Sequence, residues 1–299
     1  MLFADTLAER RQANGITLHV RRTVHDDKPP LLLLHGHPQT HAIWHRVWPT
    51  LARHFTLIAP DLRGYGDSDR PASDASVEHA PYSKREMAKD AVALMRSLGY
   101  GRFRVLAHDR GARVTHRLMV DHPDCVERAT LLDIAPTLAM YEGTTMAFAR
   151  AYWHWFFLIQ REPLPETVIE SNPAFFIEQM MGSRHAGLRA FHPEALAEYR
   201  RAIGLPGIAH AICEDYRASA TIDLEHDRAD RDMGRRISQP LQVLWGRHGI
   251  IERCFDALAL WRALADRVEG GPLPCGHYIP EEAPEALVAA ALPFLLDDR

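Results

Sequence analysis

The sequence has few cysteines, and it has no excess of charge of one sign. Its four cysteines lie far apart among 299 residues and form no CxxC pair, so reduced thiols are favoured over disulfides or a cysteine metal site. The 35 basic and 39 acidic residues give a net charge of -4 without a long run of one sign, which gives no indication of a nucleic-acid partner. The metal-binding pattern HExxH and the phosphate-binding pattern GxxxxGK(S/T) are absent, so we expect no metal ion.

Long apolar runs are also missing. No apolar stretch is long enough to span a bilayer, and the charged residue Asp5 comes too early for an amino-terminal signal peptide. The chain is 46% apolar and 25% charged, which is typical of soluble globular proteins. We therefore expect a cytoplasmic protein that has no membrane partner.

The sequence does contain a repeated alternation of short apolar runs and helical patterns. The apolar runs, which are typical of strands buried on both faces, lie at residues 31–34, 55–60, 103–106, 126–134 and 240–246. Residues 16–23 alternate apolar and polar side chains and predict a half-exposed strand near a sheet edge. Helical patterns lie at about residues 44–52, 84–98 (with Ser83 as its cap), 112–120, 254–264 and 284–296. This alternation predicts a parallel sheet with helices on both faces.

The alternation stops in the middle of the chain. Residues 137–236 are mainly helical in pattern, rich in aromatic side chains and interrupted by prolines. Most of these rings are expected to be ordinary core packing. We interpret the segment as an inserted helical cap, which divides a single core into a first part, residues 1–136, and a second part, residues 237–299.

The most informative stretch is residues 107–111, which read Ala-His-Asp-Arg-Gly. A strand, a sharp turn and a helix, with small residues two before and two after a polar residue, is the pattern of a nucleophile elbow. Here the elbow presents Asp109. A carboxylate nucleophile attacks a saturated carbon and forms an ester that water must then cleave. The alternative is an ordinary turn in which Asp109 only caps the helix.

Two further residues favour the elbow over the cap. Asp133 and His277 follow Asp109 in the chain order of the α/β-hydrolases, each at the end of a predicted strand or in a late loop. In this arrangement His277 activates water while Asp133 orients its ring. The fold class is therefore an α/β-hydrolase fold, a mostly parallel sheet flanked by helices with an inserted helical cap. The glycine-containing loop with His37, after residues 31–34, is a candidate oxyanion loop.

At the level of motifs the chain resembles the fluoroacetate dehalogenases, a haloacetate dehalogenase branch of the α/β-hydrolases. The resemblance is carried by HGxPQ at 35–39, DLRGYG at 61–66, HDRGxR at 108–113, LDI at 132–134, YWHW at 152–155 and DYR at 215–217. It implies that Asp109 displaces halide from the α-carbon of a haloacetate, and that water activated by His277 releases glycolate. His37 is a departure, because this position is usually phenylalanine in the family.

The resemblance also implies substrate-binding roles. Arg110 and Arg113 would bind the carboxylate of a small anionic substrate, while His154, Trp155 and Tyr216 would bind the departing halide. The arginine assignment also agrees with charge, because an ionised nucleophile must approach an anion and needs nearby cations. Imidazole, indole and phenol groups are donors that a leaving halide requires. No cofactor is needed, since water and side chains supply every step. Family members are often homodimers, so the resemblance allows for a homodimer.

Two other functions use the same features. An epoxide hydrolase also has an elbow aspartate, an HGxP loop and a helical cap, but it usually has an aromatic residue where this chain has Arg110. A ligand-binding protein that kept the fold and lost turnover is the other alternative, and the intact set of Asp109, Asp133 and His277 argues against it.

Overall fold

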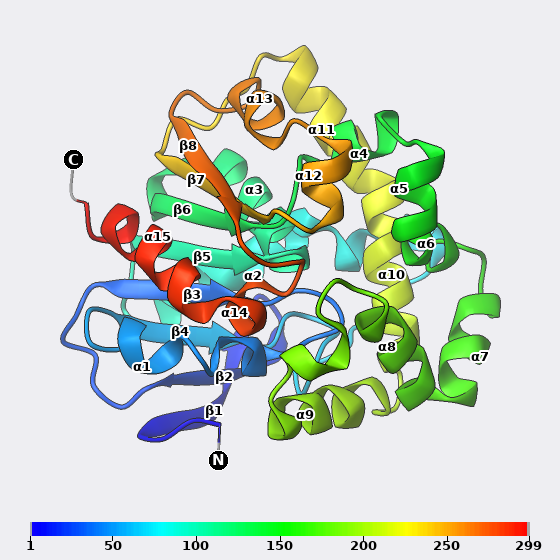
Figure 1. The fold of residues 1–299 in the computed structure, drawn as a ribbon, viewed down its shortest axis with the longest axis horizontal. Helices are drawn as coiled ribbons and strands as arrows, with labels where there is room; N and C mark the ends of the chain where they lie inside the picture. Colours follow the sequence, from blue (N-terminus) through cyan, green and yellow to red (C-terminus); the bar gives the residue numbers. More distant parts are fainter. Residues whose placement is uncertain (1, 298–299) are drawn as a thin grey trace.

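The computed structural model describes residues 2–297, and over that range an eight-stranded sheet forms the centre of the molecule (Figure 1). The strand order is β1-β2-β4-β3-β5-β6-β7-β8. β2 runs antiparallel to its neighbours β1 and β4, and the other neighbouring pairs are parallel. The strands are β1 Thr6–Ala13, β2 Ile16–Thr23, β3 Pro30–Leu34, β4 Thr56–Pro60, β5 Phe103–His108, β6 Val126–Leu132, β7 Leu241–Gly246 and β8 Val268–Leu273. The predicted mostly parallel sheet is confirmed.

Both faces of the central strands are buried, as the apolar runs predict. Alternate residues of a strand point to opposite faces. In β3, Leu31 and Leu33 pack in one cluster with Trp44 and Leu287, on the side of α1 (Trp48–Leu51) and α15 (Pro284–Leu296). Leu32 and Leu34 belong to the larger cluster on the other side, which includes residues of α2 (Lys84–Ser97) and α3 (Arg110–Asp121). The neighbouring strand β5 likewise has a packed layer on each face, because Val105 lies in the larger cluster and Leu106 in the other.

Two strands at the sheet margins do not follow from an apolar pattern. β1, with the sequence TLAERRQA, lies outside β2 and pairs with a neighbour on one side only, so its charged side chains reach solvent. β8, with the sequence VEGGPL, contains residues that disfavour strands. It forms through its parallel pairing with β7, from Leu241 opposite Val268 to Gly246 opposite Leu273.

The helices of the core agree with most of the predicted ranges. They are α1 Trp48–Leu51, α2 Lys84–Ser97, α3 Arg110–Asp121, α12 Ile250–Cys254, α13 Ala257–Arg262, α14 Ile279–Glu282 and α15 Pro284–Leu296. The predicted cap of α2 is confirmed, because the hydroxyl of Ser83 accepts a hydrogen bond from the Glu86 N–H at 3.3 Å. The single helix predicted at 44–52 is wrong. A 3-10 turn at His41–Trp44 and the short α1 stand there instead.

The segment between β6 and β7 is helical throughout its regular structure. Its α-helices are α4 Thr137–Glu142, α5 Met146–Ala151, α6 Trp153–Phe157, α7 Leu164–Ser171, α8 Pro173–Gly182, α9 Pro193–Ile203, α10 Ile208–Ala220 and α11 Ile222–Asp232. They gather to one side of the sheet, beyond the carboxyl ends of the parallel strands (Figure 1). They thus lie where ligands bind in open α/β sheets. Within residues 2–297, every helix is too short or too polar to cross a membrane.

Candidate active site

Asp109 lies at a strained turn between β5 and α3. Its backbone has φ 46° and ψ -111°, a conformation that costs energy for any residue with a side chain. The turn is crowded: a Cβ on Gly111 would lie 2.5 Å from the carbonyl oxygen of Leu34, and a Cβ on Gly36 would lie 2.4 Å from the Cβ of Asp109. The small residue predicted after the nucleophile is therefore required by backbone contact, and the geometry is that of an elbow rather than of a helix cap.

The three residues predicted to act together are adjacent. His277 Nδ1 lies 2.5 Å from Asp133 Oδ2, and His277 Nε2 lies 4.0 Å from Asp109 Oδ2. The other oxygen of Asp133 accepts a hydrogen bond from the Gly246 N–H at 2.9 Å. Because a carboxylate can only accept, Nδ1 carries the proton and Nε2 is left with a lone pair that faces Asp109. His108 Nε2 is 2.8 Å from the carbonyl oxygen of His277 and holds that loop.

The carboxylate of Asp109 is buried and ionised. Its Oδ1 accepts a hydrogen bond from the backbone N–H of His37 at 3.0 Å, which confirms that the loop after β3 points a donor at the elbow. Burial alone raises the pKa of Asp109, but its interactions with the neighbouring His277 and His108 rings and with the guanidinium groups of Arg110 and Arg113 outweigh burial and hold the pKa far below its usual range. The site therefore keeps the carboxylate of Asp109 ionised at neutral pH.

Arg110 lies beside Asp109 and is paired with a residue of the inserted helices. Its Nε and Nη2 donate to the two carboxylate oxygens of Asp215 at 2.9 and 2.7 Å, and Nη2 also donates to Ser219 Oγ at 2.6 Å. Its guanidinium carbon lies 4.2 Å from the ring centroid of Tyr216. The Nε and Nη2 atoms of the Arg110 guanidinium, which was predicted to bind the substrate carboxylate, are thus already bonded to Asp215 and Ser219. Nη1 takes no part in these contacts.

The hydrogen-bond partners of Arg113 in the described chain are neutral groups, unlike the carboxylate that pairs with Arg110. Nη1 donates to Thr137 Oγ1 at 2.8 Å and to the Ala135 carbonyl oxygen at 3.2 Å, while Nε has no hydrogen-bond partner among the residues that the structure describes. Its guanidinium carbon lies 4.6 Å from the Trp155 ring centroid. Burial lowers the pKa of Arg113, and the charge of Asp109 opposes that shift. Both predicted arginines therefore lie in the buried site, and Arg113 retains a free donor.

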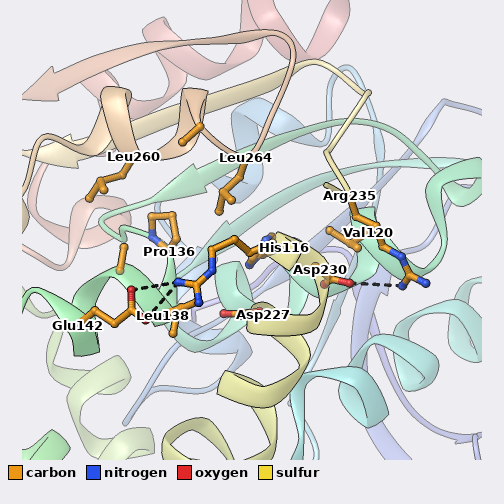
Figure 2. Close-up of a pocket in the computed structure, with 13 residues that line it drawn as sticks. His116, Val120, Pro136, Leu138, Glu142, Asp227, Asp230, Arg235, Leu260 and Leu264 are labelled. Atoms are coloured by element: carbon orange, nitrogen blue, oxygen red, sulfur yellow. Dashed lines mark hydrogen bonds and ion pairs between the residues drawn. The ribbon is translucent and has the colours of Figure 1, made fainter. Parts of the chain in front are cut away.

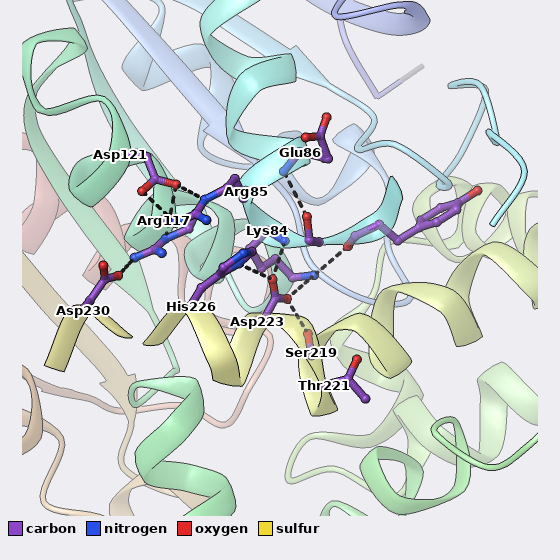
Figure 3. Close-up of polar contacts among 12 residues, drawn as sticks. Lys84, Arg85, Glu86, Arg117, Asp121, Ser219, Thr221, Asp223, His226 and Asp230 are labelled. Carbon is purple, nitrogen blue, oxygen red and sulfur yellow. Dashed lines mark hydrogen bonds and ion pairs between the residues drawn. The ribbon is translucent and has the colours of Figure 1, made fainter. Parts of the chain in front are cut away.

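Sequence reasoning missed the anions and cations that support Arg110. Lys84, the first residue of α2, forms a second ion pair with Asp215 and lies 3.7 Å from Asp223. Asp223 in turn accepts a hydrogen bond from Ser219 at 3.3 Å, and Figure 3 shows Lys84, Asp223 and Ser219 side by side. Buried charges persist when they are paired in this way. Asp215 belongs to the DYR motif, so its position next to Tyr216 was the available signal.

The three residues predicted to bind halide are brought together. His154 and Trp155 occupy the first turn of the short α6, and both rings contact Tyr216 of α10, with centroid distances of 6.0 and 6.4 Å. Trp155 is fully buried. Its indole Nε1–H has no hydrogen-bond partner within residues 2–297, and neither has the Nδ1 of His154. An indole N–H can only donate, and buried donors are rarely left unpaired in proteins, so the Nε1–H of Trp155 marks a place for an acceptor.

Comparison with known proteins decides the family. The model of the alpha/beta hydrolase fold matches residues 29–284. The chain belongs to the alpha/beta-hydrolase family.

The relatives of this hydrolase confirm the predicted resemblance. It is 41% identical to a fluoroacetate dehalogenase of a Burkholderia species, over 97% of this chain and 95% of that protein. It is 33% identical to a soluble epoxide hydrolase of a Corynebacterium species, over 89% of each. A solved structure from a Nostoc species, described as an alpha/beta hydrolase, superposes with a TM-score of 0.93 at 51% identity, over 99% of each chain.

The active site of the hydrolase adjoins a cationic cavity. This cavity has a volume of about 250 Å³, and the buried ring of His277 forms part of its wall. Arg150 and Arg253 line it with their exposed side chains, and the half-buried Arg184 also lines it. No aspartate or glutamate of the described chain is among its lining residues. The positive potential of such a cavity favours the entry of an anion.

A second cavity of the hydrolase, of about 140 Å³, is lined by residues of α3, α4, α11 and α13 (Figure 2). His116 and Asp227 line it. Burial lowers the pKa of His116 to about 3 and raises that of Asp227 to about 6. The predicted site residues are not among those that line this cavity, so we give it no part in the reaction.

Proposed function

We propose that this hydrolase cleaves the carbon–halogen bond of a haloacetate, such as fluoroacetate or chloroacetate, and releases glycolate and halide through an ester on Asp109. The observation that carries the proposal is the unpaired Nε1–H of Trp155, buried beside Tyr216 in the site of an ionised aspartate. An indole N–H can only donate. A halide ion leaving carbon is an acceptor that fits a dry, donor-lined site.

In the first step an oxygen of Asp109 attacks the α-carbon and the halide leaves with the bonding electron pair. The substrate carboxylate would be held by the free Nε of Arg113 and by Arg110, which offset the repulsion between two anions in a buried site. His154, Trp155 and Tyr216 would meet the charge that develops on the halide. The cationic cavity beside His277 supports an anionic substrate as well.

In the second step water cleaves the ester. His277 Nε2 takes a proton from a water molecule whose oxygen adds to the carboxyl carbon of Asp109, and Asp133 stabilises the imidazolium that forms. The negative charge on Asp109 Oδ1 is met by the His37 N–H. As the bond from the carboxyl carbon to the glycolate oxygen breaks, the imidazolium of His277 returns its proton to that oxygen. The carboxyl group of Asp109 keeps the oxygen of the water and releases the remaining water proton to solvent, which restores the carboxylate. Side chains and water supply every step, so the proposal needs no cofactor.

An epoxide hydrolase is the second candidate, because a specific observation favours it. Tyr152 and Tyr216 come from the segment between β6 and β7, and Tyr152 Oη lies 3.5 Å from His277 Nδ1. Two phenols above the nucleophile could donate to an epoxide oxygen. The buried charge of Arg110 and Arg113 favours the haloacetate instead, since an uncharged epoxide would not use it.

The test is a halide-release assay of the purified protein with fluoroacetate and chloroacetate, beside diol formation from styrene oxide. Asp109→Asn is the matched control because it keeps the shape of the side chain. Release of either halide by the parent and not by the variant supports the proposal, and it excludes a ligand-binding protein that lost turnover. Diol formation without halide release would make the second candidate correct.

Three further expectations belong to this proposal. Residues 137–236 act as the cap that covers the site, and the helices α4–α11 within that range support this division. The homodimer and the cytoplasmic location remain predictions from the resemblance and the composition. Sedimentation of the purified protein tests the first of these two.

A further inference from the structure

The ring of His37 lies within the cluster of aromatic donors beside Asp109. Its centroid is 5.3 Å from that of Tyr216 and 6.3 Å from that of His154, and those two rings are 6.0 Å apart. The three rings therefore form a closed triangle. The backbone N–H of His37 is bonded to Asp109 Oδ1 at 3.0 Å, so the same residue meets the nucleophile through its main chain and the ring cluster through its side chain.

The ring of His37 carries an unused donor and an unused acceptor. The residue is 3% exposed, and neither Nδ1 nor Nε2 has a hydrogen-bond partner in the described chain. Burial lowers the pKa of His37 to about 3, so the ring is neutral at neutral pH and one of its nitrogens carries a proton. The same cluster contains two further buried nitrogens without a hydrogen-bond partner, Nε1 of Trp155 and Nδ1 of His154.

We propose that the ring N–H of His37 is a further leaving-group donor, which joins His154, Trp155 and Tyr216 in binding the departing halide. This inference rests on the proposed function. His37 donates a hydrogen bond and keeps its proton, because halide leaves with the bonding electron pair and needs no proton to depart. The main-chain N–H of the residue keeps its separate contact with Asp109.

Fluoride depends on such a donor more than chloride does. Fluoride is small, concentrates its charge and is the poorer leaving group, so its departure relies on donors that meet the charge as it develops. Chloride is larger and leaves more readily. The ring of His37 is therefore expected to set the ratio of fluoroacetate to chloroacetate turnover, rather than the overall level of activity.

The test compares His37→Phe, His37→Asn and His37→Gln with the parent for both substrates. All three variants keep the backbone N–H on Asp109. Removal of one preorganised donor in His37→Phe is expected to lower kcat for fluoroacetate about 100-fold, and to lower kcat for chloroacetate much less. Asn places an amide N–H near the position of Nδ1, and Gln places one near Nε2. One of the two is expected to recover at least part of the fluoroacetate rate.

Three results would overturn the inference. If His37→Phe lowers both rates by the same factor, the residue acts through packing. If neither amide variant exceeds His37→Phe with fluoroacetate, the ring N–H is not the group that matters. If the parent releases no halide, both the proposed function and this inference are wrong. If the parent releases halide and His37→Phe has the same ratio of fluoroacetate to chloroacetate turnover as the parent, only this inference is wrong.

Discussion

Both carboxylate oxygens of Asp215 in α10 accept hydrogen bonds from Arg110 in α3, from Nε at 2.9 Å and from Nη2 at 2.7 Å. Burial opposes both charges, yet the pair lowers the pKa of Asp215 and raises that of Arg110 well above its usual range. One residue of the inserted helices thus fixes the side chain that follows Asp109. The orientation of the Arg110 guanidinium depends on a contact with a residue 105 positions away in the chain.

Asp215→Asn tests that dependence. The amide keeps the shape but removes the charge, which leaves Arg110 and Lys84 without their shared anion, so the free energy of unfolding should fall by about 3–5 kcal/mol. The KM for haloacetate should rise at least about 10-fold, as expected for loss of a charged contact. Ser219→Ala is the control, because it removes one neutral partner of Arg110 and keeps the ion pair. A KM unchanged by Asp215→Asn would contradict the role.

Gly36→Ala should disable the elbow. An added Cβ would lie 2.4 Å from the Cβ of Asp109, which is closer than real Cβ atoms approach. Halide release should fall at least about 100-fold, because small displacements of reacting groups have large effects on rate. Gly101→Ala is the matched control, since nothing in the described chain lies within 4 Å of the Cβ that it adds. Equal activity of the two variants would show that the close approach is not required.

Trp155→Phe should separate activity from stability. The change removes the indole N–H and keeps an aromatic ring, so halide release should fall about 100-fold. Trp261→Phe is the matched control, because both tryptophans are fully buried and both changes leave a void of similar size. Trp261 Nε1 donates to the Ile134 carbonyl oxygen at 3.1 Å, whereas the unpaired N–H of Trp155 costs about 1–3 kcal/mol of stability that its removal recovers. The melting temperature should therefore fall less for Trp155→Phe than for Trp261→Phe, and an equal or larger fall for Trp155→Phe would mean that its N–H is already satisfied.

Acid should destabilise the fold just below the ordinary pKa of histidine. Burial holds the pKa of His116 at about 3. Between about pH 6.5 and pH 3 the unfolded chain therefore binds a proton at His116 that the folded chain does not bind. The free energy of unfolding falls by about 1.4 kcal/mol for each unit by which the pH is lowered in this range. His116→Phe should make this slope shallower in denaturant titrations at pH 7, 6 and 5. His25→Phe, at an exposed position, should leave the slope unchanged, and equal slopes for both variants would refute the assignment.

The central strands, the elbow and the order of the three reacting residues could be predicted from the sequence. Strands buried on both faces need apolar residues at successive positions, and the turn around Asp109 needs Gly111, so these features are local. β1 and β8 could not be predicted, because an edge strand is half solvated and a strand such as VEGGPL forms only through its partner.

The parts of the site that depend on distant contacts could not be predicted either. Nothing near Arg110 in the sequence reveals Asp215 or Lys84 as its neighbours. The motif at 35–39 gave the position of His37 but not the rings around it. The chemical roles of Asp109, Asp133 and His277 remain proposals, although their adjacency agrees with the prediction.

The most direct test of the account is whether an ester forms on Asp109. In His277→Asn the base that activates water is absent, while the nucleophile and the contact of His37 with Asp109 are kept. After incubation with chloroacetate, mass spectrometry of a protease digest should show one carboxymethyl group on the peptide that contains Asp109, with chloride released in a single equivalent. A variant that releases chloride continuously, or whose Asp109 peptide stays unmodified after chloride release, would contradict the proposed mechanism.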